Sequence, residues 1–143
     1  MRAYSFVFAV GFAVAGSFAI AQDAKDPTVV ARQGVMTTIA MNTKALGDMA
    51  GGKTAFDATA AEAAKAAMIA AAAEIPARFE AQATDPASKA KPEIWTNWED
   101  FLADATALSQ AAAAVDTSGA DTLKPGLGAL GAACKDCHSA FRM

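Results

Sequence analysis

Near the end of the 143-residue chain stands the pentapeptide Cys134-Lys135-Asp136-Cys137-His138, a C-x-x-C-H sequence. This spacing is the attachment signature of c-type haem, in which the two thiols add to the haem vinyl groups and the histidine ligates the iron. On a helix, positions 134, 137 and 138 are related as i, i+3 and i+4, so they share one face. One helical turn can therefore hold a haem covalently and coordinate its iron, and the rest of the chain has to leave room for it.

Three other interpretations of the motif compete with haem attachment. A redox C-x-x-C of the thioredoxin type follows a strand and opens a helix, whereas this motif ends a predicted helix in a chain without a βαβ pattern. A zinc site would lack a fourth ligand, because the chain has no further Cys or His. A structural disulfide would leave His138 unexplained. The motif therefore predicts one covalently bound haem c.

The first 21 residues have the pattern of a secretory signal peptide. Arg2 supplies the positive start, Phe6–Ile20 is apolar and uncharged, and Ala19-Ile20-Ala21 matches an A-x-A cleavage site. The alternative is an uncleaved membrane anchor, because the uncharged run is nearly long enough to span a bilayer. The polar segment that begins at Gln22 favours cleavage. We expect residues 1–21 to be a cleaved signal peptide, residues 22–143 to form one domain, and the mature protein to lie in a bacterial periplasm.

The charge of the mature chain limits its partners. Cleavage removes Arg2 and no acidic residue, so the formal net charge moves from −3 to −4. This mild acidity argues against nucleic acid or an anionic membrane as a partner, and it leaves open a basic redox protein that the sequence does not identify. Catalysis would need acid–base groups over the iron. No second His exists, and no carboxylate stands on a predicted core stripe, so we do not expect an enzyme.

The mature chain is rich in Ala and has few β-branched runs, which predicts an all-α protein. The first helix should begin with Asp26 as N-cap and Pro27 at its first position, and end at Gly51-Gly52. The second should start after Asp57, and Pro76 should kink or end its last turn. Their inward stripes are Val29, Met36, Ile39, Thr43, Leu46 and Ala50 in the first helix, and Ala61, Met68, Ala72, Ile75 and Phe79 in the second.

A polar connection from Gln82 to Lys91 separates these helices from two more. The third should start at a capping box formed by Thr96 and Glu99, and end near residues 117–119. The fourth should follow Asp121, with Pro125 in its first turn and both thiols on its core face. Four helices of about 20 residues with short connections predict an antiparallel four-helix bundle that holds the haem in its core.

The mature chain as a whole resembles the class II cytochromes c, the family of cytochrome c′ and cytochrome c-556. The resemblance rests on the helix order and on three sequences: Cys134-Lys135-Asp136-Cys137-His138 near the C-terminus with Phe141-Arg142 behind it, Arg32-Gln33-Gly34-Val35-Met36, and Lys91-Pro92-Glu93-Ile94-Trp95. It implies that Cys134 and Cys137 form the thioethers and that His138 is the proximal ligand. Arg142 would lie on the proximal side, and Arg32 and Gln33 near the haem edge and propionates.

The resemblance leaves two functions open, which differ in what Met36 does. In cytochromes c-556 a methionine of the first helix ligates the iron and gives an electron carrier, which is the function we favour. In cytochromes c′ the iron is five-coordinate and binds small gases such as nitric oxide or carbon monoxide. As a base rate, a methionine on a core stripe packs more often than it ligates. The family also implies a homodimer that pairs through the first and second helices.

Overall fold

The computed structural model describes residues 23–143, so the expected signal peptide and its cleavage site before Gln22 lie outside the described residues. Within that part all regular secondary structure is helical, apart from a single antiparallel bridge between Ala90 and Arg142. The helices are α1 (Pro27–Ala50), α2 (Ala58–Phe79), α3 (Glu93–Thr96), α4 (Trp98–Ala113) and α5 (Ala120–Phe141).

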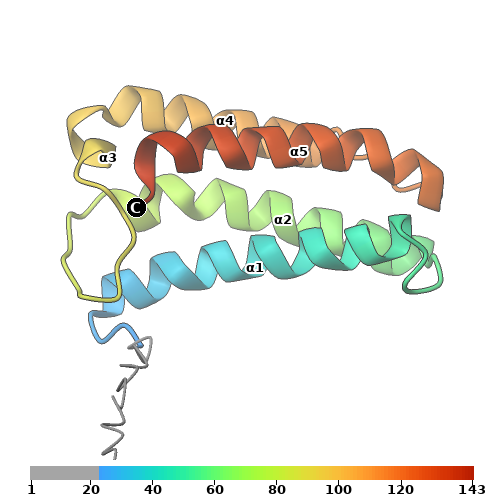
Figure 1. The fold of residues 1–143 in the computed structure, drawn as a ribbon, viewed down its shortest axis with the longest axis horizontal. Helices are drawn as coiled ribbons and strands as arrows, with labels where there is room; N and C mark the ends of the chain where they lie inside the picture. Colours follow the sequence, from blue (N-terminus) through green and yellow to red (C-terminus); the bar gives the residue numbers. More distant parts are fainter. Residues whose placement is uncertain (1–22) are drawn as a thin grey trace, which may run out of the picture.

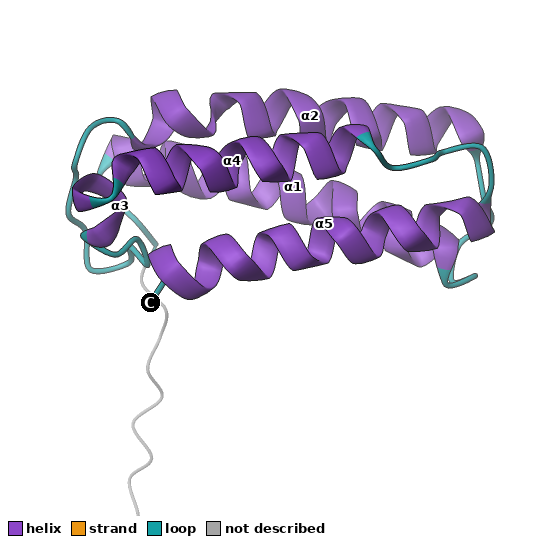
Figure 2. Cartoon of the chain, turned by 90° about the horizontal axis from the view of Figure 1, so that it is seen from above, coloured by secondary structure: helices purple, strands orange, loops and turns teal. Residues whose placement is uncertain are grey.

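The four long helices form an antiparallel bundle (Figures 1 and 2). Along the chain, α1, α2, α4 and α5 run alternately in opposite directions, and the contacts join α1 to α2, α2 to α4, α4 to α5 and α5 back to α1. The all-α four-helix prediction is confirmed. No helix from residue 23 onward is both long and apolar enough to cross a bilayer.

The first two helices begin and end where the sequence predicts. The Asp26 carboxylate accepts hydrogen bonds from the backbone N–H groups of Thr28 and Val29, at 2.8 and 3.1 Å. Asp57 caps α2 in the same way through the Ala60 N–H, at 2.8 Å. These carboxylates satisfy N–H groups that have no partner within the helix. Beyond α1 the backbone reverses at Gly52, whose φ of +70° favours glycine.

The capping box predicted at Thr96 is wrong. Thr96 is the last residue of the short helix α3, which the sequence analysis did not foresee, and its hydroxyl donates to the Glu93 carbonyl. The N-cap of α4 is Asn97, which makes no side-chain capping bond. Pro92 allows a new helical turn directly after it, because a proline needs no N–H partner in a first turn.

The later helix ends also differ from the prediction. Helix α4 ends at Ala113, earlier than expected, and α5 starts at Ala120 rather than after Asp121. Thr122 sets that start, because its hydroxyl accepts from the Gly119 N–H at 3.0 Å and can donate to nearby carbonyls. Pro125 is tolerated inside α5 since it lies close to the helix start.

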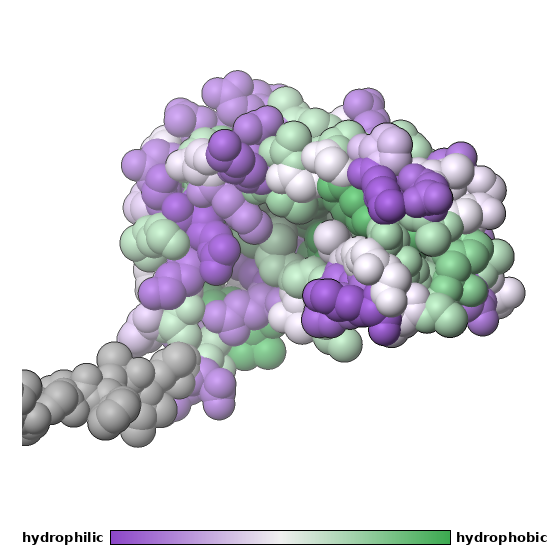
Figure 3. Space-filling view, turned by 45° about the vertical axis from the view of Figure 1, so that its right-hand side comes forward, coloured by the Kyte–Doolittle hydropathy of each residue, from purple (hydrophilic) through white to green (hydrophobic). Residues whose placement is uncertain are grey.

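Small residues let the helices pack closely. The core contains buried Ala at positions 61, 64, 71, 72, 105 and 112, between larger side chains such as Leu46, Met68, Leu123 and Leu130. Gly126 of α5 lies so close to the turn after α4 that an added Cβ would stand 2.8 Å from the Val115 Cα. Many other alanines lie outside the core, and Figure 3 shows hydrophobic residues reaching the surface between hydrophilic ones.

A cluster of aromatic side chains fills the end of the bundle where α5 finishes. Phe101 of α4 contacts Phe79, Trp98 and Phe141, with ring centroids 5.2, 5.4 and 5.4 Å apart. Each such pair stabilises the fold by about 0.5–1.5 kcal/mol beyond the contribution of the apolar area that it buries. The cluster packs the last turn of α5, which begins at the His138 of the C-x-x-C-H motif, against α2 and α4.

Candidate cofactor site

A cavity of about 470 Å³ opens at this aromatic end of the bundle. Its walls come mainly from α1, from residues 88–90 before α3, and from the end of α5, with one residue each from α2, α3 and α4. Its size is in the range of cofactor and small-molecule sites in proteins. The lining residues are Val29, Arg32, Gln33, Met36, Thr37, Ala40, Phe79, Ser88, Lys89, Ala90, Ile94, Phe101, Cys137, His138, Phe141 and Arg142.

The cavity brings together nearly all the residues that the sequence singled out. Helix α1 contributes Arg32, Gln33 and Met36, α5 contributes Cys137 and His138, and Arg142 follows directly after α5. Cys134 lies one turn before Cys137 and does not line the cavity. Both thiols pack against the edge of the core but are only partly buried. They therefore lie on the predicted face of the helix, although they are less buried than the prediction of a core position implies.

The two thiols are held in their protonated form. Burial raises the pKa of both, and for Cys137, where the Asp104 carboxylate adds to the effect, to about 11. A redox C-x-x-C needs the opposite, because its attacking thiol has a lowered pKa. Among residues 23–143 no group of three or more His, Cys, Asp or Glu side chains is placed to hold a metal ion by itself.

Asp104 of α4 is a partly buried carboxylate that the sequence analysis missed. Its pKa is raised by burial first, and then by the neighbouring carboxylates of Asp136 and Asp100. A helical pattern places Asp104 next to the buried Ala105, at the margin of the stripe. Periodicity alone does not reveal that α5 packs over that margin.

His138 faces the cavity as a neutral imidazole. Burial lowers its pKa from the ordinary value, and the positive charge of Arg142 lowers it further. The backbone fixes the pair, because the Arg142 N–H donates to the His138 carbonyl at 3.1 Å. Neutral imidazole is the form of histidine that binds metals.

Arg32 is the one charged side chain buried in the described chain, with 3% of its surface exposed. Its guanidinium donates to three backbone carbonyls after or near the end of α2: Arg78 at 3.1 Å, Ala83 at 3.4 Å, and Ala81. It also lies between two rings, with its central carbon 5.3 Å from Phe79 and 5.0 Å from Trp95. Arg32 therefore closes the C-terminal end of α2 as well as lining the cavity.

The segment 80–92, which connects α2 to α3, forms one edge of the cavity and is tied down from several sides. The Gln33 side-chain amide donates to the Ala87 carbonyl at 3.1 Å. The Asp85 carboxylate accepts from the backbone N–H groups of Lys25, Asp26 and Ala87, at 2.8–2.9 Å. These bonds join the start of α1 to the cavity edge.

The same segment also holds the C-terminus. The Met143 N–H donates to the Lys89 carbonyl at 2.8 Å, and the Lys91 N–H donates to the Phe141 carbonyl at 3.0 Å. The Lys91 ammonium caps the end of α5 through the Ser139 and Ala140 carbonyls, at 3.1 and 3.2 Å. Sequence reasoning treated this connection only as a polar loop. Its contacts join residues about 50 positions apart, so no local pattern could reveal them.

The chemistry of the cavity walls fits a c-type haem. Cys137 and His138 of α5 and Met36 of α1 line the cavity, so a thiol, an imidazole and a thioether belong to its lining residues. Apolar rings of Phe79, Phe101 and Phe141 supply a surface for a flat macrocycle. A second thiol, Cys134, stands one turn away along the same helix.

Comparison with known proteins agrees with this chemistry. The family model described as Cytochrome C' matches residues 27–142. A cytochrome c-556 of Agrobacterium fabrum is 34% identical over 78% of this chain and 78% of its own. The structure of a cytochrome c′ from Rhodobacter superimposes with a TM-score of 0.74, at 30% identity, and covers 81% of this chain and 95% of that one. A nitric oxide complex of a cytochrome c′ variant from Alcaligenes xylosoxidans has a TM-score of 0.69, at 28% identity, with 80% and 93% covered.

Proposed function

The chain belongs to the cytochrome c′ family, a family of non-enzymatic haem proteins, and we propose that it is a periplasmic one-electron carrier whose iron is held by His138 and Met36. As a family member it binds one haem c covalently, through Cys134 and Cys137. When bound, the haem supplies an iron that gains or loses one electron. The ligand set and the electron-carrier role are the proposal.

His138 is suited to hold the iron from the α5 side. Its imidazole is neutral, since burial and Arg142 lower its pKa, and it lines the cavity directly beside Cys137. Because the thioether at Cys137 would anchor the macrocycle next to it, the imidazole needs no search to reach the metal. Arg142 lies one turn further and fixes the histidine carbonyl through its own N–H.

The observation that carries the electron-carrier proposal is that Met36 lines the same cavity as His138, from a different helix. Its side chain is partly buried and packs against the core. A thioether is a soft, neutral ligand, and a His/Met pair raises the reduction potential of haem iron. With both axial positions filled by the protein, electron transfer would need little rearrangement, which suits a carrier.

A spectrum of the purified haem protein tests the role of Met36. Ligation by Met36 should give a low-spin ferric spectrum with the near-infrared band of a thioether–iron bond, and sharp α and β bands after reduction. Met36→Ala should abolish that band and open the iron to carbon monoxide. The matched control is Met41→Ala, because Met41 stands on the same helix but is 66% exposed and outside the cavity. A high-spin wild-type spectrum that Met36→Ala leaves unchanged would contradict the proposal.

The alternative function is reversible binding of nitric oxide or another small gas. It is favoured by one observation: solved structures related to this chain include nitric oxide complexes. In that case Met36 would only pack against the haem face. The wild type would then bind gases readily, and Met36→Ala would enlarge the pocket and speed their entry.

The covalent bond and the export signal have their own tests. Haem should remain with the polypeptide through denaturing electrophoresis, because thioethers survive unfolding. Protein recovered from the periplasmic fraction should begin at Gln22. Haem that separates on denaturation would contradict attachment, and an intact N-terminus on membrane-bound protein would show an anchor instead.

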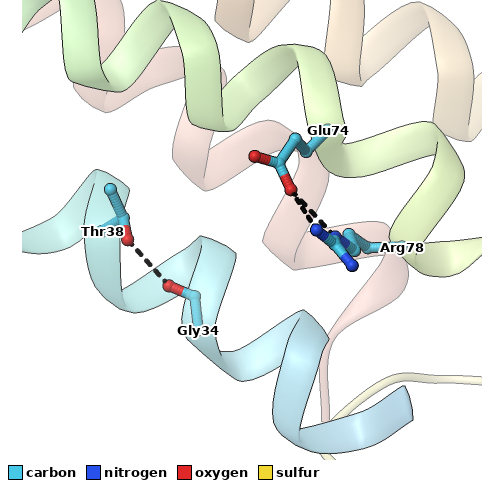
Figure 4. Close-up of polar contacts among 4 residues, drawn as sticks. All are labelled: Gly34, Thr38, Glu74 and Arg78. Carbon is cyan, nitrogen blue, oxygen red and sulfur yellow. Dashed lines mark hydrogen bonds and ion pairs between the residues drawn. The ribbon is translucent and has the colours of Figure 1, made fainter.

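We also propose that two copies pair through α1 and α2, as the family resemblance implies. A shallow groove between these helices is lined mainly by small residues of both, and the Glu74–Arg78 ion pair stands along it, opposite Gly34 and Thr38 (Figure 4). Val30 and Met41, on the same stripe of α1, are 48% and 66% exposed. Light scattering should give the mass of a dimer, and Met41→Glu should weaken it. A monomer at all concentrations would contradict this arrangement.

A further inference from the structure

We propose that the ammonium group of Lys89 pairs with a carboxylate at the anionic edge of the haem. This inference rests on the proposed function, because it needs the haem to occupy the cavity. A haem carries two propionate groups, and a carboxylate beside apolar walls is costly unless it is paired or reaches water. A cation at the cavity edge would offset this cost by pairing with a propionate.

The charged residues that line the cavity are all of one sign. They are Arg32, Lys89 and Arg142, and no Asp or Glu is among the lining residues. Since the chain as a whole carries a net charge of −3, this local excess of positive charge is not a consequence of composition. It matches a ligand that brings negative charge into the cavity.

Arg32 is largely committed to other partners. Its Nε and both terminal nitrogens already donate to the carbonyls of Arg78, Ala83 and Ala81, and its plane is enclosed by two aromatic rings. Only its remaining N–H groups could reach a propionate. The role that the family resemblance gives Arg32 at the propionates is thus at most a shared one.

Arg142 lies next to the proximal ligand. Both residues line the cavity, and the Arg142 N–H donates to the His138 carbonyl at 3.1 Å. A cation held by the backbone beside the proposed iron ligand lies on the proximal side of the cavity. Lys89 is the remaining lining cation, and it stands on the segment between α2 and α3.

The backbone holds Lys89 rigidly at the cavity edge. Its carbonyl accepts from the Met143 N–H at 2.8 Å, and the next residue, Ala90, forms the bridge to Arg142. Its neighbour Lys91 uses its ammonium to cap α5. The Lys89 ammonium forms no ion pair with another group in residues 23–143. A fixed backbone with a long cationic side chain is a suitable partner for a carboxylate.

The test compares Lys89→Gln with Lys53→Gln in the haem-loaded protein. The loop that follows α1 lies at the end of the bundle opposite the C-terminus (Figure 1), and Lys53 in this loop does not line the cavity, so its replacement removes the same charge away from it. The midpoint potential is measured by spectroelectrochemistry across a pH series, at low and high salt. Removing a cation beside the haem favours the more positive, ferric state, so Lys89→Gln should lower the potential, and more so at low salt.

Pairing with a carboxylate makes a second, more specific prediction. Without Lys89 the propionate should bind its proton more readily, so the step in potential caused by its titration should move to higher pH. Lys89→Arg should restore both the potential and the position of that step. A lowered potential without a moved step, or a profile equal to that of Lys53→Gln, would overturn the inference. A wild type without covalent haem would instead overturn the proposed function.

Discussion

Replacing Arg32 by lysine should destabilise the protein although it keeps the charge. The guanidinium reaches the carbonyls of Arg78, Ala81 and Ala83 at once because its donors are spread over a rigid plane. A lysine ammonium is a single point on a flexible stem. It can satisfy one of these carbonyls, and it loses the flat contact with the rings of Phe79 and Trp95.

The size of the effect follows from these contacts. Losing two hydrogen bonds costs about 1 kcal/mol each, and weaker contact with two rings costs about 0.5 kcal/mol each. Water can reach the carbonyl of the exposed residue Ala81 and recover part of that loss. We therefore expect a net loss of about 2 kcal/mol for Arg32→Lys, and about 3–4 kcal/mol for Arg32→Ala, which also leaves a void.

The measurement is urea and thermal unfolding of the haem-loaded variants. For a domain of this size, 2 kcal/mol corresponds to a fall of about 8 °C in the melting temperature. Gln33→Ala is the matched control, since it removes one hydrogen bond of an exposed neighbour and should cost about 0.5 kcal/mol. If Arg32→Lys loses no more stability than this control, Arg32 does not hold the end of α2 as described.

Two further changes test the packing and the cavity edge. Gly126→Ala should destabilise by about 1–3 kcal/mol, because its Cβ would meet the Val115 backbone, whereas Gly128→Ala meets nothing and should stabilise by up to about 1 kcal/mol in chemical denaturation. Equal effects would show that α5 does not approach Val115 so closely. Hydrogen bonds from three backbone N–H groups lower the pKa of the Asp85 carboxyl. The ionised carboxylate therefore contributes to the stability of the fold above its unfolded pKa, about 3.9, and this stability is lost as the pH falls through the lower folded pKa. The difference in melting temperature between the wild type and Asp85→Asn should therefore begin to shrink as the pH falls below about 4, and a constant difference would contradict this role.

Local patterns in the sequence were enough to predict the four-helix bundle and the helical turn that carries the haem attachment motif. Asp26 and Asp57 cap their helices as predicted, because the side chain and the N–H groups that it satisfies are two or three residues apart. The spacing of Cys134, Cys137 and His138 fixes the attachment chemistry within one turn. The apolar stripe of α2 is likewise a property of one helix. Where a local signal was ambiguous, as at Thr96, a nearby proline and a short unforeseen helix overrode it.

The tertiary structure decided which of these residues share a cavity. Met36 and His138 are about 100 positions apart in the chain, and only the packing of α1 beside α5 lets them line the same space. The role of Arg32 at the end of α2, and the anchoring of segment 80–92 to both chain ends, depend on contacts between residues 46 to 60 positions apart. Helical periodicity tells which face of an element is apolar, but it does not tell which other element covers that face or which polar groups meet there. That information arises only when the helices pack, because each such contact is formed by two distant segments at once.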